Sequence, residues 1–84
     1  MIEHFGQYLK SLRELKRLTL RDVETLAKNE ITNGYLSQIE TGRVDSPSIK
    51  TFVILAKVYG VPPIKLIELF IDHTIDLKAM EGEG

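Results

Sequence analysis

Residues 31–42 read Ile31-Thr32-Asn33-Gly34-Tyr35-Leu36-Ser37-Gln38-Ile39-Glu40-Thr41-Gly42, which is the pattern of one short, sharply bounded helix. Thr32 can act as the N-cap, because a threonine hydroxyl accepts hydrogen bonds from the free N–H groups of a first helical turn. Gly42 stands where the helix would stop, since glycine adopts the left-handed conformation without a steric penalty. Ile31, Leu36 and Ile39 follow helical spacing and predict one apolar edge.

The other faces of this predicted helix carry Asn33, Gly34, Ser37 and Gln38, none of which is charged. Amide side chains can bond bidentately to adenine in the major groove of DNA. The pattern therefore indicates a helix that reads DNA, held in place by the rest of the chain.

Composition limits the possible folds. A chain of 84 residues allows one domain with one modest core. Cysteine is absent, which excludes a disulfide framework and a thiolate zinc site. No run of 18 apolar residues and no signal-peptide pattern occurs, so we expect a soluble cytoplasmic protein with no membrane partner.

Charge is unevenly distributed along the chain, whose net charge is −1. Residues 1–65 hold ten Lys or Arg and seven Asp or Glu, giving +3, whereas residues 66–84 hold one Lys and five acids, giving −4. A mild local excess of Lys and Arg is enough for contacts with some phosphates. It argues against strong non-specific binding to DNA. We divide the chain into a helical domain over residues 1–72 and an acidic C-terminal extension over residues 73–84.

Two helices are predicted ahead of residue 31. The first runs from about Ile2 to Lys16, and its apolar stripe consists of Phe5, Tyr8, Leu9, Leu12 and Leu15. The second runs from about Leu20 to Lys28 and begins with a capping-box arrangement of Thr19 and Asp22. Val23 and either Leu26 or Ala27 are expected to face inward.

Two further helices are predicted after Gly42. Ser46 or Ser48 can cap the first of them, and Gly60 ends it; its inward stripe is Ile49, Phe52, Val53, Ala56 and Tyr59. The last helix begins near Pro63, because proline suits a first helical position.

Apolar residues cover two faces of the last helix. One seam is Ile64, Ile67, Ile71 and Ile75, and the other is Leu66, Phe70 and Leu77. A small core needs only one seam, so we expect the other to contact a second subunit, with Leu66, Phe70, Ile71 and Ile75 as dimer candidates. The alternative is that both seams pack on the same core.

Four separated segments together carry a resemblance to a known family. They are Leu18-Thr19-Leu20-Arg21-Asp22-Val23-Glu24, Asn33 to Gly42, Ser46-Pro47-Ser48, and Leu55-Ala56-Lys57-Val58-Tyr59-Gly60-Val61-Pro62. Over about residues 5–70 the chain resembles the lambda-repressor-like, Xre-type helix-turn-helix family. The resemblance implies a compact all-α, five-helix domain in which the second and third helices form the helix-turn-helix. It also implies a homodimer on double-stranded DNA, at a palindromic operator whose half-sites lie about one DNA turn apart.

The resemblance assigns roles to individual residues. Asn33, Gly34, Ser37 and Gln38 are candidates for base contacts, and the candidates for contacts with the DNA backbone are Arg17, Arg21, Thr32, Tyr35, Arg43 and Lys50. Tyr35 has the alternative of filling the surface of the core. Arg13 and Glu40 match a structural ion pair that ties the first helix to the end of the third.

Three features depart from the family pattern. Leu20 stands where many members have a glutamine that contacts phosphate. Arg17 stands where glycine is frequent at the end of the first helix, so either that helix ends differently or Arg17 adopts a costly backbone conformation. The segment Leu26–Glu30 is about two residues longer than the usual turn, so the second helix extends or the turn bulges.

We therefore expect a transcriptional regulator, a repressor, that binds double-stranded DNA sequence-specifically with the helix over about residues 32–41 in the major groove. The alternative is a helical protein-binding module, an antitoxin or adaptor that works through its apolar last helix. An enzyme is not expected, because His4 and His73 are far apart and no glycine-rich phosphate loop occurs. We expect no metal, no cofactor and no ligand-sensing domain.

Overall fold

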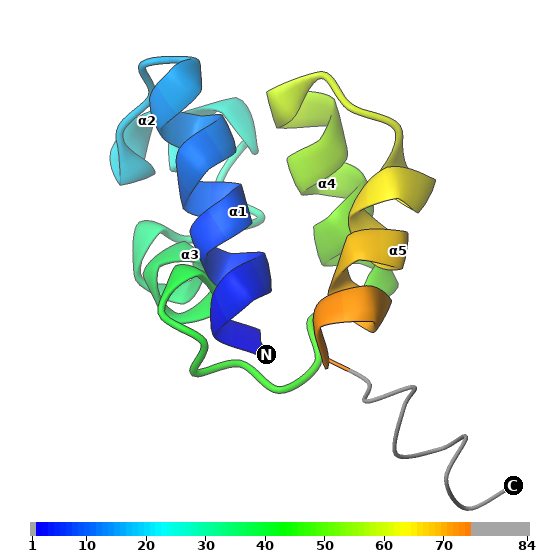
Figure 1. Cartoon of the computed structure of the whole chain (residues 1–84). Coiled ribbons are helices and arrows are strands. Elements are labelled where there is room, and N and C mark those ends of the chain that lie inside the picture. Colours follow the sequence, from blue (N-terminus) through cyan, green and yellow to red (C-terminus); the bar gives the residue numbers. More distant parts are fainter. Residues whose placement is uncertain (1, 75–84) are drawn as a thin grey trace, which may run out of the picture.

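The computed structural model describes residues 2–74 of the chain, with the side chains of residues 5–72. Residues 2–74 form five helices and no strand: α1 (Ile2–Leu15), α2 (Leu20–Leu26), α3 (Asn33–Glu40), α4 (Ile49–Tyr59) and α5 (Pro63–Thr74) (Figure 1). The all-α, five-helix fold predicted from the sequence is confirmed. Ile75, Leu77 and nearly all of the acidic extension lie outside the described residues.

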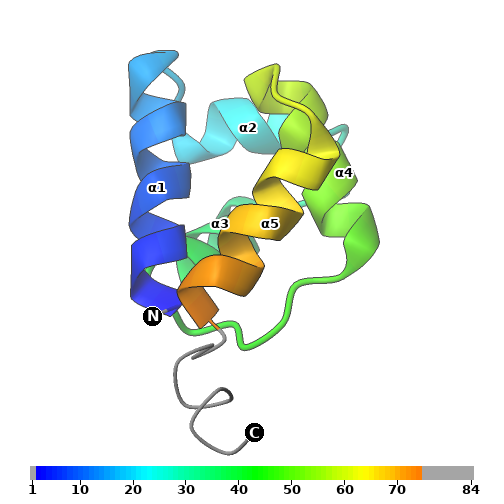
Figure 2. The same ribbon diagram turned by 45° about the vertical axis from the view of Figure 1, so that its right-hand side comes forward.

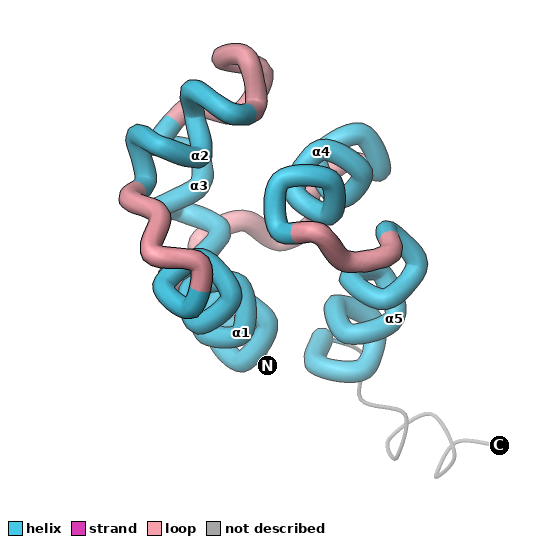
Figure 3. The backbone as a smooth tube through the Cα atoms, turned by 90° about the horizontal axis from the view of Figure 1, so that it is seen from above, coloured by secondary structure: helices cyan, strands magenta, loops and turns pink. Residues whose placement is uncertain are grey.

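The helices form two groups. α1 packs against α3 and α5, α2 packs against α3, and α4 packs against α5. Seen from above, α1, α2 and α3 lie on one side of the molecule, and α4 and α5 lie on the other (Figure 3). α5 runs antiparallel to α1, so the end of α5 returns to the level at which α1 begins (Figure 2). This arrangement leaves α3 at the surface with one edge covered by α1.

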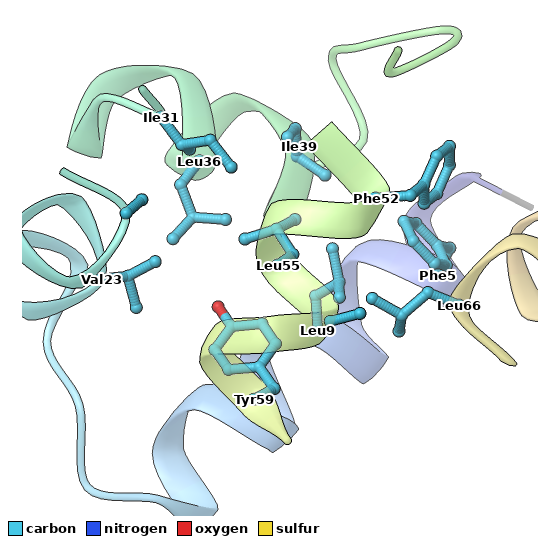
Figure 4. Packing of buried hydrophobic residues seen from close by; sticks show 12 residues of the cluster. Phe5, Leu9, Val23, Ile31, Leu36, Ile39, Phe52, Leu55, Tyr59 and Leu66 are labelled. Atoms are coloured by element: carbon cyan, nitrogen blue, oxygen red, sulfur yellow. The ribbon is translucent and has the colours of Figure 1, made fainter. Parts of the chain in front are cut away.

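The core lies between the two groups and draws on every helix. Its buried apolar residues are Phe5, Leu9, Val23, Ala27, Ile31, Leu36, Ile39, Phe52, Leu55, Ala56, Tyr59 and Leu66 (Figure 4). The predicted inward stripes are wrong at Leu15 and Ile49, whose exposed fractions are 78% and 65%. Both lie in the terminal turn of a helix, where the helical repeat continues but no other element covers the side chain.

Three phenylalanines join α1, α4 and α5. The Phe5 ring lies 5.8 Å from that of Phe52 and 5.2 Å from that of Phe70, and the Phe52 and Phe70 rings are 5.4 Å apart, all in edge-to-face geometry. This is a favoured arrangement for aromatic quadrupoles. Leu66 is 0% exposed, so its assignment to a dimer surface is wrong, and the half-buried Phe70 ring also contributes to the core. Of the apolar α5 residues, Ile64 and Ile71 are exposed.

The ends of α1 and α2 explain two departures from the family pattern, Arg17 in place of glycine and the long segment Leu26–Glu30. Five of the described residues follow helices in the left-handed conformation: Gly42 and Gly60, as predicted, but also Arg17 (φ 58°), Lys28 (φ 54°) and Asn29 (φ 65°). Leu18 N–H donates to the Arg13 carbonyl (3.1 Å) and Arg17 N–H to the Glu14 carbonyl (2.9 Å), which is the Schellman pattern. Thus α1 ends in the usual way, and Arg17 adopts the costly conformation.

Replacing Arg17 with glycine should therefore stabilise the fold. A left-handed residue with a side chain costs about 1–2 kcal/mol, and part of that gain is offset by the greater freedom of glycine in the unfolded chain. We expect the free energy of unfolding to rise by about 0.5–1 kcal/mol, as measured by urea denaturation. Glu14→Gly, inside α1, is the matched control and should destabilise; a loss of stability in Arg17→Gly would contradict the prediction.

The long segment between α2 and α3 is a bulged turn. α2 ends at Leu26 rather than at Lys28, because the backbone at Lys28 and Asn29 (φ 65°) is left-handed. Asn29 N–H donates to the Glu24 carbonyl at 2.9 Å, which closes the end of α2. Of the two candidates for the inward position, Ala27 is buried and Leu26 is 55% exposed.

Candidate nucleic-acid interface

Both ends of α3 are fixed by the residues that the sequence indicated. The Thr32 hydroxyl accepts from the Tyr35 N–H at 3.1 Å, as an N-cap does. At the other end Gly42 is left-handed (φ 78°), and Arg43 N–H donates to the Gln38 carbonyl at 2.8 Å. The predicted N-cap and stop are confirmed. α3 is therefore a rigid helix of about two turns.

The inner edge of α3 consists of Leu36, Ile39 and Glu40, all buried. The Glu40 carboxylate accepts two hydrogen bonds from Arg13 of α1, from Nε at 2.8 Å and from Nη2 at 3.0 Å. Arg13 Nη1 donates to the Leu18 carbonyl at 2.9 Å, so the guanidinium also holds the connection into α2. The bond to Glu40 raises the pKa of Arg13 above its ordinary value. The ion pair expected from the resemblance is present and joins α1, the α1–α2 connection and α3.

Gly6 of α1 also sets the position of α3, and sequence reasoning missed it. A Cβ on Gly6 would lie 2.4 Å from the Glu40 carbonyl oxygen and 2.6 Å from that of Ile39. Only glycine allows the two backbones to approach so closely. The available signal was a glycine inside a predicted helix, which costs helix stability and usually has a packing reason.

The outer face of α3 carries Gly34 and Gln38, both exposed, with Ser37 half-buried beside them. A Cβ on Gly34 would meet no atom within 4 Å, so this part of the helix backbone is open to an approaching surface. Ser37 and Thr41 line a shallow groove between α3 and α1, whose α1 wall carries Gln7 and Lys10. The face thus offers an amide, a hydroxyl and bare backbone, with one lysine at its border.

Asn33, the fourth candidate for a base contact, already has a partner within the protein. Its side-chain Nδ2 donates to Glu24 Oε1 at 3.0 Å, and its backbone N–H donates to Glu24 Oε2 at 3.2 Å. Glu24 lies on α2, and both residues are half-buried. No sequence pattern selects Glu24, because the contact depends on how α2 crosses the start of α3.

The candidates for contacts with the DNA backbone differ in their surroundings. Arg17, Arg21, Arg43 and Thr32 are exposed, whereas Tyr35 is half-buried and packs against the core. Lys50 is exposed but pairs with Glu30 at 2.7 Å, and this pairing raises the pKa of Lys50 and lowers that of Glu30. A phosphate contact by Lys50 would therefore compete with an existing ion pair.

Two negative findings concern the described residues alone. No helix within residues 2–74 is long and apolar enough to cross a membrane. In the same part of the chain, no group of three or more His, Cys, Asp or Glu residues is arranged to hold a metal ion.

A polar helix presented at the surface, preceded across a bulged turn by a shorter helix that packs against it, defines a helix-turn-helix domain. A family model described as a helix-turn-helix domain matches residues 4–69. The chain belongs to this family, which is a family of DNA-binding domains, and the resemblance to Xre-type proteins agrees with it. Comparison with curated proteins and with solved structures gave no match.

Proposed function

We propose that this protein is a transcriptional regulator that binds double-stranded DNA sequence-specifically, with α3 in the major groove. The observation that carries the proposal is the division of α3 into two edges. Leu36, Ile39 and Glu40 fix the inner edge, while Gly34 and Gln38 remain exposed and uncharged on the outer face. Because amide side chains can bond bidentately to base edges, this face favours readout of sequence.

Phosphate contacts supply the remaining affinity in this proposal. Arg21 lies in the first turn of α2 and Arg43 follows α3, and both are exposed. Thr32 uses its oxygen as an acceptor from Tyr35 N–H, which leaves its hydroxyl proton for a phosphate. With so few cations nearby, selectivity comes from α3. Repression is the proposed outcome, since a domain bound over a promoter excludes other proteins from it.

A two-fold dimer on a palindromic operator is the second part of the proposal. Two recognition helices of such a dimer enter adjacent major grooves about 34 Å apart. The support from the structure is the apolar surface of α5, where Ile64 is 61% and Ile71 is 40% exposed. Ile64→Glu and Ile71→Glu should give folded monomers in sedimentation, whereas a wild type that stays monomeric at high concentration would contradict the dimer.

The test of the proposed function is selection of bound sites from random double-stranded DNA. We expect one recurrent, palindromic sequence, with an affinity that falls steeply as salt rises because counterions are released from phosphates. The double variant Asn33→Ala, Gln38→Ala should stay folded and lose its sequence preference. If that variant keeps its preference, the assignment of the readout to α3 is wrong. If a protein partner but no DNA site is recovered, the protein-binding module becomes the better description.

Gly34→Ala gives a separate prediction. The added methyl group meets no protein atom within 4 Å, and alanine favours the helix by about 1 kcal/mol over glycine. We expect thermal stability to rise and affinity for the selected site to fall, because the methyl group occupies space that the DNA needs. An unchanged affinity would show that the backbone at Gly34 does not approach DNA closely.

A further inference from the structure

The contact between Glu24 and Asn33 determines which way the Asn33 amide faces. The carboxylate lies 3.0 Å from Nδ2 and 3.2 Å from the backbone nitrogen of Asn33. A carboxylate oxygen only accepts hydrogen bonds, whereas an amide has a donor end and an acceptor end. The donor end of the Asn33 side chain must therefore face Glu24, and the reversed orientation would set two acceptors against each other.

This orientation leaves a defined set of groups for a ligand. Glu24 Oε1 uses one hydrogen of Nδ2, so the side chain retains its second Nδ2 hydrogen and both lone pairs of Oδ1. In the major groove, adenine presents an acceptor at N7 beside a donor at N6. Guanine presents two acceptors, and thymine presents one acceptor and a methyl group. Cytosine presents a donor at N4 but no acceptor beside it, so adenine alone pairs with both the free Nδ2 hydrogen and Oδ1.

We propose that Glu24 is a positioning residue that makes Asn33 select adenine, by holding the amide with Oδ1 toward the DNA. The inference rests on the proposed function, because it assigns the specificity of the same readout helix. The bonds to Asn33 come from α2 and therefore fix the side chain before DNA arrives. Such preorganisation lowers the ordering cost of binding.

Glu24→Gln tests whether the orientation of the Asn33 amide matters, because Asn33 keeps a hydrogen-bonding partner in this variant. Glutamine has the same length and can still hydrogen-bond to Asn33, but its amide offers both a donor and an acceptor. The Asn33 amide can then turn over and donate to guanine as readily as it accepts from adenine. A bidentate base contact contributes roughly 5- to 150-fold in discrimination, so we expect the preference for adenine over guanine to fall about fivefold or more at one position of each half-site.

The experiment is selection from random DNA, with wild type, Glu24→Gln, Asn33→Ala and Glu14→Gln in parallel. Asn33→Ala identifies the base position that Asn33 reads. Glu14→Gln removes the same charge from the exposed face of α1 and should leave every base preference unchanged. Loss of the preference for adenine at the Asn33 position alone, in Glu24→Gln, supports the proposal. An unchanged preference there, or a preference of the wild type for guanine, thymine or cytosine, overturns it.

Failure of the proposed function gives a different result. If the wild type selects no sequence, then the regulator and the role of Glu24 both fail. If the wild type selects a site and Glu24→Gln selects the same site with the same preferences, only the role of Glu24 fails. The selection measures base preference only on DNA that folded protein has bound. A modest loss of stability in the variant therefore does not change the measured preference.

A second measurement needs no DNA. The side-chain amide of Asn33 gives a pair of proton–nitrogen NMR signals, which Asn33→Ala identifies by their disappearance. In the wild type the two hydrogens should exchange with water at different rates, because Glu24 holds one of them. Glu24→Ala should make the two rates similar. Equal rates in the wild type would contradict the contact and overturn the proposal.

Discussion

Replacing Glu40 with alanine should lower the free energy of unfolding by about 3–5 kcal/mol, because the Arg13 guanidinium would stay buried without its partner. The side chains of Arg13 and Glu40 are only 11% and 5% exposed, and two hydrogen bonds of 2.8 and 3.0 Å join them. The total stability of a domain is about 5–15 kcal/mol, so this loss is a large fraction of it. Urea denaturation of both proteins at the same pH measures the change.

Two controls test whether the loss of stability comes from the burial of the ion pair or from the loss of any ion pair. Glu30→Ala breaks the exposed pair with Lys50 and should change stability far less, because water and salt screen exposed charges. Replacing Arg13 and Glu40 together by leucine should recover much of the loss, since no unpaired charge then remains buried. If Glu40→Ala is no worse than Glu30→Ala, the pair does not hold α1 to α3 as described.

The second large effect is expected from Gly6→Ala. The new methyl group would be placed 2.4 Å from the Glu40 carbonyl oxygen and 2.7 Å from the Glu40 carbonyl carbon, which are backbone atoms and cannot rotate away. α1 and the end of α3 must therefore separate, and overpacking of this kind costs about 1–3 kcal/mol. Without the clash, alanine would stabilise the helix by about 1 kcal/mol relative to glycine. A net loss of stability in Gly6→Ala must therefore come from the close approach of the two backbones.

Gly34→Ala is the matched control for Gly6→Ala, because it makes the same change within a helix where no atom lies within 4 Å. Calorimetry should show a lower melting temperature for Gly6→Ala and a higher one for Gly34→Ala. We also expect Gly6→Ala to weaken DNA binding under conditions in which it is folded, since the displaced helix carries Ser37 and Gln38. Equal melting temperatures for the two variants would contradict close packing at Gly6.

Local chemistry made most of the helix boundaries predictable. Thr19 with Asp22, Thr32 and Gly42 act as caps or stops where expected, because each depends only on residues within one turn. The pKa of the Asp22 carboxyl is lowered, mainly by its hydrogen bond with the Thr19 backbone N–H and less by the Thr19 side chain. These contacts belong to the capping box that the sequence predicts. The predicted end of α2 at Lys28 is wrong, because nothing in the residue type marks Lys28 as left-handed.

Helical spacing was less informative about what each apolar residue contacts. The two seams of α5 are visible in the sequence, but periodicity alone does not show which one the core covers. The structure buries Leu66 and packs the Phe70 ring against Phe5 and Phe52, and it leaves Ile64 and Ile71 exposed. The exposed surface that remains for a partner is therefore smaller than the sequence suggested.

The sequence by itself determined that residues 31–42 form a capped helix with an apolar edge and an uncharged polar face, because capping and helical spacing act over a few residues. Only the tertiary structure decided how that helix is held and what its polar face can offer. Gly6 and Glu24 lie far along the chain from their contacts on α3, so no local rule pairs them with Glu40 and Asn33. These long-range contacts exist because packing of the core brings α1 and α2 against α3, and they determine its position and the orientation of its first side chain.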